Sequence, residues 1–231
     1  MFLVDVKELS KSFGSVRAVD SVSLQLKEGE LFGLLGPNGS GKTTIIKCLT
    51  GQVRPDAGSV SVSGLDVFKE RVRVRGVVGI IPEQESPPSF LTAEEYLFFA
   101  AKVRRMKDFK GAIDHWFDFL EFSDQRKVLC KDLSRGTRQK LMFAQGFLHD
   151  PSLAFIDEPL VNLDPLIQKK MKDFLKKRVK EGKTVFLSTH SLEIAKELCT
   201  RLCILKQGKI VYSGKPKRNM EGFFLKLVKN G

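Results

Sequence analysis

The stretch GPNGSGKTT, residues 36–44, decides how the rest of the chain is interpreted. It fits the pattern G-x-x-x-x-G-K-[ST] from Gly36 to Thr43, after the apolar run LFGLL at residues 31–35 and before a helical pattern. In that setting the pattern predicts a loop whose backbone N–H groups hold phosphates at the N-terminus of a helix. The alternative is a glycine-rich turn with a chance lysine, and the flanking strand and helix patterns argue against it.

The residues of this loop have separate tasks in holding a nucleotide. Its glycines let the backbone curl so that successive N–H groups point inward. Lys42 should reach the β- and γ-phosphates, and the Thr43 hydroxyl should bind Mg²⁺. The predicted nucleotide-binding residues of the loop are Gly36, Pro37, Asn38, Gly39, Ser40, Gly41, Lys42, Thr43 and Thr44.

Two further segments supply groups that such a loop requires. LAFIDEP, residues 153–159, is an apolar run that ends in Asp157 and Glu158, at the strand end where ligands bind in open α/β sheets. We expect Asp157 to bind Mg²⁺ and Glu158 to orient or deprotonate an attacking water. FLSTHS, residues 186–191, contains His190. A lone histidine at a strand end is more often structural, but beside a phosphate site it can sense the γ-phosphate.

Composition is that of a soluble globular protein. The chain has 231 residues, of which 42% are hydrophobic and 29% charged, and its formal net charge is +12. No run of about 18 uncharged apolar residues occurs, so no membrane span is expected. The N-terminus lacks the pattern of a secretory signal, so secretion of the protein is not expected. The basic charge suits an acidic ligand, a nucleic acid or an anionic membrane face, or else a lysine-rich solvated surface.

The order of strand and helix patterns predicts an α/β protein of one domain, 1–231. A core with a β-subdomain, at about 1–89 and 150–214, is interrupted by a helical insert at about 90–149, and a tail follows at 215–231. Thr92 and Glu95 form a capping-box pattern at the start of the insert. Gln207-Gly208 marks the turn of a β-hairpin. Strands are expected at 2–9, 22–26, 31–35, 59–64, 76–81, 153–157, 184–190 and 201–214.

Several motifs follow the phosphate loop in one order: LSRGTRQK (133–140), LAFIDEP, VNLD (161–164) and STH (188–190). In that order they resemble the nucleotide-binding subunit of an ABC transporter over essentially the whole chain. The resemblance implies the ABC ATPase fold, a P-loop NTPase core with a mixed β-sheet, an antiparallel β-subdomain and an all-helical insert. It also implies a signature motif at Ser134, Arg135 and Gly136, a D-loop at Asp164, a switch histidine at His190 and an adenine-stacking aromatic at Phe13. A core aromatic is the alternative for Phe13.

DLSRGTRQK, residues 132–140, has the features of a second anion site at a helix start. The motifs contain one phosphate-binding lysine, Lys42, one Mg²⁺-binding aspartate, Asp157, and one candidate base, Glu158. These groups suffice for one nucleotide. A second anion site must therefore serve a nucleotide bound elsewhere. The resemblance implies where: in a head-to-tail dimer, the signature of one chain covers the γ-phosphate held by the other.

The chain departs from the family pattern at three places. The usual signature is Leu-Ser-Gly-Gly-Gln, whereas this chain has Arg135 and Thr137, which resembles a subgroup of exporter-type ATPases. The D-loop has Val161-Asn162 where small residues are usual. At the position where the family has its Q-loop glutamine, this chain has Glu83, and Gln84 follows one residue later. Either residue is a candidate to contact Mg²⁺.

The resemblance implies an ATPase that uses ATP and Mg²⁺ to drive a separate transmembrane permease subunit, as a homodimer or as a heterodimer with a second ATP-binding subunit. It implies a cytoplasmic protein at the cytoplasmic face of the cell membrane. We expect the permease to contact the surface between Glu83 and about Met106, including Arg104 and Arg105, because this segment joins the strand end near the γ-phosphate to the helical insert. The alternative is a nucleic-acid-associated ATP switch of the same superfamily, which the charge permits but for which no nucleic-acid module is recognisable. Transported substrate, direction of transport and the role of the basic tail stay open.

Overall fold

The computed structural model describes residues 2–84, 86–160 and 163–229. The strands are β1 (Val4–Phe13), β2 (Val16–Leu26), β3 (Leu31–Leu35), β4 (Ala57–Val62), β5 (Leu65–Asp66), β6 (Val78–Ile81), β7 (Leu153–Asp157), β8 (Thr184–Thr189), β9 (Arg201–Lys206) and β10 (Lys209–Gly214). The helices are α1 (Lys42–Leu49), α2 (Arg71–Val77), α3 (Ala93–Val103), α4 (Lys110–Phe119), α5 (Arg135–Phe147), α6 (Pro165–Lys180), α7 (Leu192–Leu198) and α8 (Met220–Lys229). Two short 3₁₀ turns, Ser123–Gln125 and Cys130–Asp132, lie between α4 and α5.

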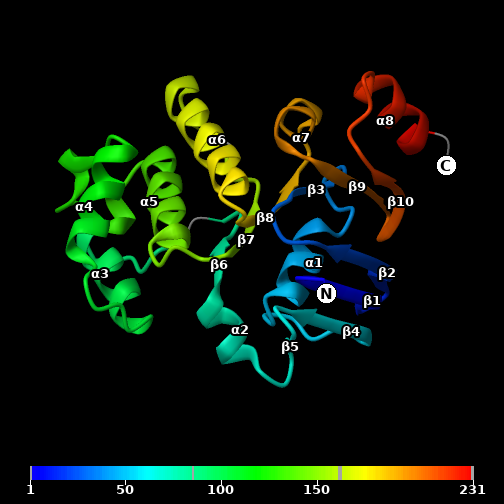
Figure 1. The fold of residues 1–231 in the computed structure, drawn as a ribbon, viewed down its shortest axis with the longest axis horizontal. Helices are drawn as coiled ribbons and strands as arrows, with labels where there is room; N and C mark the ends of the chain where they lie inside the picture. The colour runs from blue at the N-terminus through cyan, green and yellow to red at the C-terminus, as the bar shows by residue number, and fades with distance from the viewer. Residues whose placement is uncertain (1, 85, 161–162, 230–231) are drawn as a thin grey trace.

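A six-stranded mixed sheet forms the centre of the molecule, in the order β10-β9-β3-β8-β7-β6 (Figure 1). Strands β9, β3, β8, β7 and β6 are parallel, and β10 is antiparallel to β9. Every residue of β3, β7 and β8 is buried, which is why these strands appear in the sequence as continuous apolar runs rather than as alternating patterns. The parallel strands therefore end at one common edge, where the phosphate loop begins.

A second, antiparallel sheet has the order β2-β1-β4-β5. Its strands alternate in burial, because one face packs on the rest of the protein and the other faces water. Val6 and Leu24 on its inner face belong to the same apolar cluster as Ile45 of α1 and Phe155 of β7. Helix α1, which starts at the phosphate loop, is thus held between the two sheets.

Helices α3, α4 and α5 pack together beside the mixed sheet, at the left of Figure 1. The capping box predicted from the sequence is confirmed: the Thr92 side chain accepts from the Glu95 N–H, and the Glu95 carboxylate accepts from the Thr92 N–H. Helix α5 lies directly on β6, where any side chain at Gly146 would collide with Ile81. The helical layer is consequently fixed to the sheet through α5.

The fold class expected from the sequence is confirmed, with differences at several elements: β1 and β2 are longer than the strands expected at 2–9 and 22–26, and the short β5 was not expected. Residues 76–77 belong to α2, so β6 begins at Val78 rather than at residue 76. Helix α2 was not expected, because its sequence, RVRVRGV, alternates as a strand would. Helix α7 was not expected either. The tail forms α8, on which Phe223, Phe224 and Leu227 pack against the main core.

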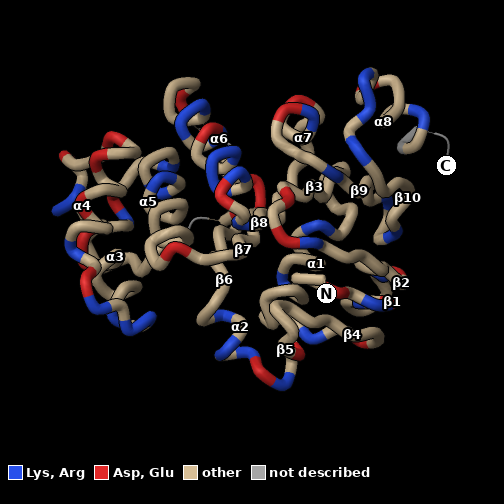
Figure 2. The backbone as a smooth tube through the Cα atoms, viewed as in Figure 1, with Lys and Arg blue, Asp and Glu red and all other residues tan. Residues whose placement is uncertain are grey.

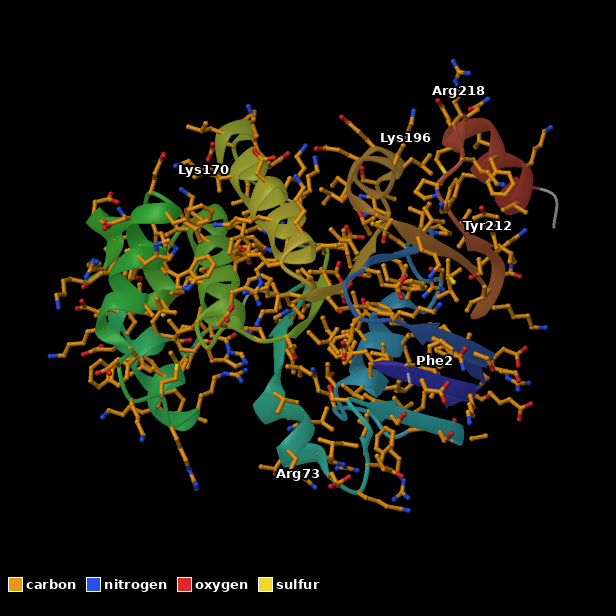
Figure 3. All side chains as sticks on the ribbon, viewed as in Figure 1. Phe2, Arg73, Lys170, Lys196, Tyr212 and Arg218 are labelled. Atoms are coloured by element: carbon orange, nitrogen blue, oxygen red, sulfur yellow. The ribbon has the colours of Figure 1, made fainter. Side chains whose placement is uncertain are left out.

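Charged side chains are distributed widely over the surface. In the view of Figure 2, lysines and arginines occur on α2, α6 and α8, and acidic residues lie among them. Figure 3 shows Arg73 on α2, Lys196 on α7 and Arg218 just ahead of α8 at the periphery of the molecule. Within the described residues, no helix is both long and apolar enough to cross a membrane.

Candidate active site

The predicted site residues follow the ends of four strands at one edge of the mixed sheet. The phosphate loop follows β3, Glu83 follows β6, Asp157 ends β7, and His190 follows β8. The register of the parallel pairs places these strand ends next to one another, since Leu35 is opposite Thr189 and Asp157 is opposite Ser188. Chemistry from four distant parts of the sequence is therefore brought to one place.

The loop wraps around the start of α1. Gly41 is the N-cap residue, with φ of +108°, and a side chain there would collide with the Ala18 carbonyl, so only glycine fits. The Lys42 side chain is 7% exposed, and its Nζ donates to the carbonyls of Gly36, at 2.9 Å, and Pro37, at 3.2 Å. The ammonium group is thus held inside the loop. The Ser40 hydroxyl is buried and has no hydrogen-bond partner among the described residues.

The loop and the acidic residues line one cavity of about 210 Å³. Carboxylate and hydroxyl oxygens face it together with backbone N–H groups at a helix start, which are the donors and acceptors suited to Mg²⁺ and to phosphate. The residues of this set therefore fit an Mg²⁺–nucleotide. The lining residues are Ala18, Asn38, Gly39, Gly41, Lys42, Thr43, Thr44, Glu83, Asp157 and Glu158.

The two carboxylates after β7 have different environments. Asp157 is buried and accepts a hydrogen bond from the Ser188 hydroxyl, which fixes its carboxylate at the floor of the cavity. Glu158 is also buried, and its Oε1 lies 2.8 Å from Nδ1 of His190, while its Oε2 accepts from the Thr189 hydroxyl at 3.3 Å. Because an ionised carboxylate only accepts, this contact requires the hydrogen on Nδ1 of His190.

The structure separates the two Q-loop candidates. Glu83 lines the cavity, and its Oε2 lies 3.4 Å from the Thr43 hydroxyl. Gln84 does not line this cavity but lines a neighbouring one of about 310 Å³, which Glu83, Thr43 and Asp157 also line. Of the pair, the carboxylate is the residue that faces the loop.

The second anion site predicted at residues 132–140 is at the start of α5. Ser134 is the N-cap, and its hydroxyl accepts from the Thr137 N–H at 3.1 Å. Ser134 and Arg135 are exposed and Gly136 is half-buried. None of these three lines the cavity formed by the described loop residues. The predicted second anion site is therefore separate from the cavity at the phosphate loop.

Phe13 and Asp164 lie outside the cavity as well. Phe13 is 50% exposed, so its interpretation as a core aromatic is wrong, and Lys11 Nζ lies 5.4 Å from its ring centroid. Asp164 is the N-cap of α6, where its Oδ1 accepts from the Ile167 N–H at 2.9 Å. The departure noted at Val161-Asn162 lies outside the described residues.

Three parts of the site were missed by the sequence interpretation. Ala18 lines the cavity from β2, and nothing in its local sequence indicates this. Ser188 and Thr189 hold the two carboxylates, although they were quoted within the STH motif. Gln139 on α5 is 1% exposed, and its side chain donates at 3.0 Å to the carbonyl of Pro159, the residue that follows Glu158. A polar residue at an inward-facing helix position was the signal that pointed to it.

Comparison with known proteins gives a consistent result. Residues 19–161 match the family model described as ABC transporter. An uncharacterized ABC transporter ATP-binding protein of Methanocaldococcus jannaschii is 35% identical over 92% of this chain and 77% of its own length. The Nod factor export ATP-binding protein I of Rhizobium meliloti is 33% identical over 92% of this chain, which spans only 64% of that relative.

Solved structures agree with the sequence matches. The ATP-binding subunit of an ABC transporter superimposes with a TM-score of 0.88 at 28% identity, covering 96% of this chain and 94% of that one. A dimeric ATP-binding cassette in a post-hydrolysis state, bound to ADP and Pi, gives 0.85 at 25% identity, covering 93% and 99%.

Proposed function

We propose a mechanism from the premise that this chain belongs to the ABC transporter family, as an ATP-binding and ATP-hydrolysing cassette. The proposal assigns the ATP site to the loop at residues 36–44 and the base to Glu158. It is carried by one observation: Lys42, Thr43, Asp157 and Glu158 meet in a single cavity.

In this proposal the loop N–H groups and Lys42 bind the phosphates of ATP, and Phe13 stacks on the adenine. Thr43 and Asp157 hold Mg²⁺, which neutralises charge on the β- and γ-phosphates. Glu158 accepts a proton from the attacking water. Nδ1 of His190 lies 2.8 Å from Glu158 Oε1, and an imidazolium ring at this position would donate from Nδ1 to Glu158 and from Nε2 to a γ-phosphate oxygen. The base and the phosphate sensor are thus one connected pair.

We assign the metal-facing Q-loop position to Glu83, which gives the site a carboxylate where the family usually has an amide. Replacing Glu83 with Gln removes that negative charge. The Mg²⁺ concentration for half-maximal ATPase should then rise by about tenfold, as expected for loss of a charge-assisted contact of about 1.5 kcal/mol. Titration of ATPase rate against Mg²⁺ measures this. Gln84→Ala is the matched control and should shift the midpoint less than twofold. The reverse pattern would assign the metal to Gln84.

The signature residues Ser134, Arg135 and Gly136 act, in this proposal, on a nucleotide held by a second cassette. Support comes from the exposure of Ser134 and Arg135, from the position of all three residues outside the chain's own cavity, and from the dimeric state named for one solved relative. The second cassette is either a copy of this chain or a related one. The proposal also assigns Asp164, the N-cap of α6, to this contact between cassettes.

We further propose that the chain works at the cytoplasmic face of a membrane by docking on a transmembrane permease subunit, and that it drives export. The direction is supported by the relatives named for Nod factor export. The docking surface is proposed between α2 and α3, where a cavity of about 520 Å³ has the exposed apolar residues Val72, Phe99 and Val103 on its walls. Isolated exposed residues are ordinary, but three around one hollow suit a protein partner.

The two arginines after α3 differ in ways that the sequence did not reveal. Arg104 points inward, with its guanidinium 2.8 Å from Nε2 of His149 and in contact with the Val78 carbonyl. Burial and the Arg104 charge lower the pKa of His149 to about 4, so this imidazole is neutral at pH 7 and accepts the hydrogen bond. Arg105 is exposed. A charge reversal that tests docking therefore belongs at Arg105, since one at Arg104 would disrupt the α2–β6 junction.

Phe99→Asp is expected to release most of the chain from membranes that contain its permease, because a charge would then face the apolar wall of the docking surface. The measurement is the membrane-bound fraction in sedimentation, at physiological salt and near 1 M salt, where screening falls to about 3 Å. Leu225→Asp, an exposed apolar residue on α8, is the matched control and should stay bound. If Leu225→Asp is released and Phe99→Asp is not, the basic tail is the membrane contact.

A further inference from the structure

Gln139 has no role in the proposed mechanism, although it lies next to the site. Its side-chain amide is buried against the core on the inner side of α5, and Nε2 donates to the Pro159 carbonyl at 3.0 Å. Pro159 is the residue that follows the proposed base, Glu158. The contact therefore joins the helix that begins at the signature residue Ser134 to the backbone that carries the base.

The backbone at Glu158 needs external support. Its φ is +50°, in the left-handed region that side-chain-bearing residues adopt at a cost, and such conformations persist where neighbouring groups determine them. The Glu158 N–H donates to the Ser188 carbonyl at 3.2 Å, and its carboxylate contacts Thr189 and His190. These three contacts all come from β8 or the residue after it. Gln139 supplies a contact on the other side of Glu158, from the helical layer.

We propose that Gln139 is a positioning residue, through which α5 sets the place of the Glu158 carboxylate in the cavity. This inference rests on the proposed role of Glu158 as the base. Helix α5 runs without interruption from Arg135 to Phe147, and Gln139 lies five residues, or about 7.5 Å along the axis, from Ser134. A shift of α5 when Ser134 engages a phosphate is thus transmitted to the Pro159 carbonyl and to the base. The signature helix of each chain adjusts that chain's own catalytic carboxylate.

A purely structural role for Gln139 makes a different prediction. A buried amide–carbonyl hydrogen bond contributes to stability, and its loss alone would lower the unfolding midpoint without changing the turnover of the folded protein. Positioning instead predicts a loss in kcat, because a displacement of about 1 Å at a reacting group costs up to about a hundredfold in rate. Gln139 does not line the cavity, so a positioning role predicts that kcat falls while ATP affinity stays nearly unchanged.

The test replaces Gln139 with Met, which has a similar length but no donor. We expect kcat for ATP to fall by about tenfold to a hundredfold, while the dissociation constant for ATP changes less than about twofold. In a Glu158→Gln background the Gln139→Met substitution should cause no further loss of the residual rate, because the group it positions is already inactive. Equal losses in both backgrounds, or an unchanged kcat, would overturn the proposal.

Two additional variants keep the outcome unambiguous. Thr184→Val removes a buried hydroxyl that accepts from the Gly29 N–H at 3.0 Å, at the opposite end of β8, so it should lower stability without lowering kcat. If Gln139→Met does not fold, Gln139→Asn, which keeps the amide but is one methylene too short, takes its place with the same expectations. Normal turnover by Glu158→Gln alone would refute the base assignment and not the contact of Gln139.

Discussion

Replacing Glu158 with Gln should lower ATP turnover by about a hundredfold or more, while ATP and Mg²⁺ binding stays within about twofold. The amide preserves the shape of the side chain but cannot accept a proton at neutral pH. The phosphate loop does not change, and Asp157 still accepts from the Ser188 hydroxyl. Binding and chemistry should therefore separate, which a structural defect at this buried position would not produce.

Phosphate release and ATP binding, measured on the same preparation, test this expectation. Glu181→Gln is the matched control, because Glu181 is an exposed carboxylate at the far end of α6, 3.8 Å from Lys177. It should leave both quantities unchanged. Turnover of Glu158→Gln close to that of the native chain would show that another group activates the water. His190 would then be the first candidate, because it is in contact with Glu158.

The sequence predicted the parts of this site that depend on local rules. The phosphate loop is specified by a short pattern around Lys42, and Asp157 lies at a strand end because an apolar run stops there. The hairpin at Gln207-Gly208 also follows from local preference, since both residues adopt positive φ at the turn between β9 and β10. In each of these places the backbone conformation is determined by neighbours in sequence.

The remaining features depend on contacts between distant residues. Whether Glu83 or Gln84 faces the loop is decided by the direction of the chain after β6, which no pattern in IPEQES encodes. The contact of Gln139 with Pro159 requires α5 to lie against the end of β7. Arg104 lies in a basic stretch that resembles a solvated surface, and only its hydrogen bonds with the Arg75 carbonyl and His149 show that it turns inward.

A dimer in which each chain completes the other's site predicts a specific pattern of complementation. Ser134→Arg places a bulky cation at the N-cap of α5, where it removes the hydroxyl cap and obstructs a phosphate. This chain should still bind one ATP, because Ser134 does not line its own cavity, yet turnover should fall to background. Lys42→Ala should instead lose ATP binding, because the loop loses its buried ammonium group. Each variant alone is expected to be inactive.

Mixing the two variants should restore turnover, to at most about a quarter of the native rate if chains pair at random, and to less where the coupling through α5 and Gln139 makes Glu158 depend on Ser134 of its own chain. In the mixed dimer, the intact loop of the Ser134→Arg chain meets the intact signature of the Lys42→Ala chain, while the other site carries both defects. No recovery would mean that the signature acts within its own chain or that both sites must be intact together. Cysteines placed at Ser134 and Asn38 distinguish these: a crosslink in the dimer band supports contact between chains, whereas one confined to the single-chain band refutes it. The four native cysteines are buried, so they should not compete in this reaction.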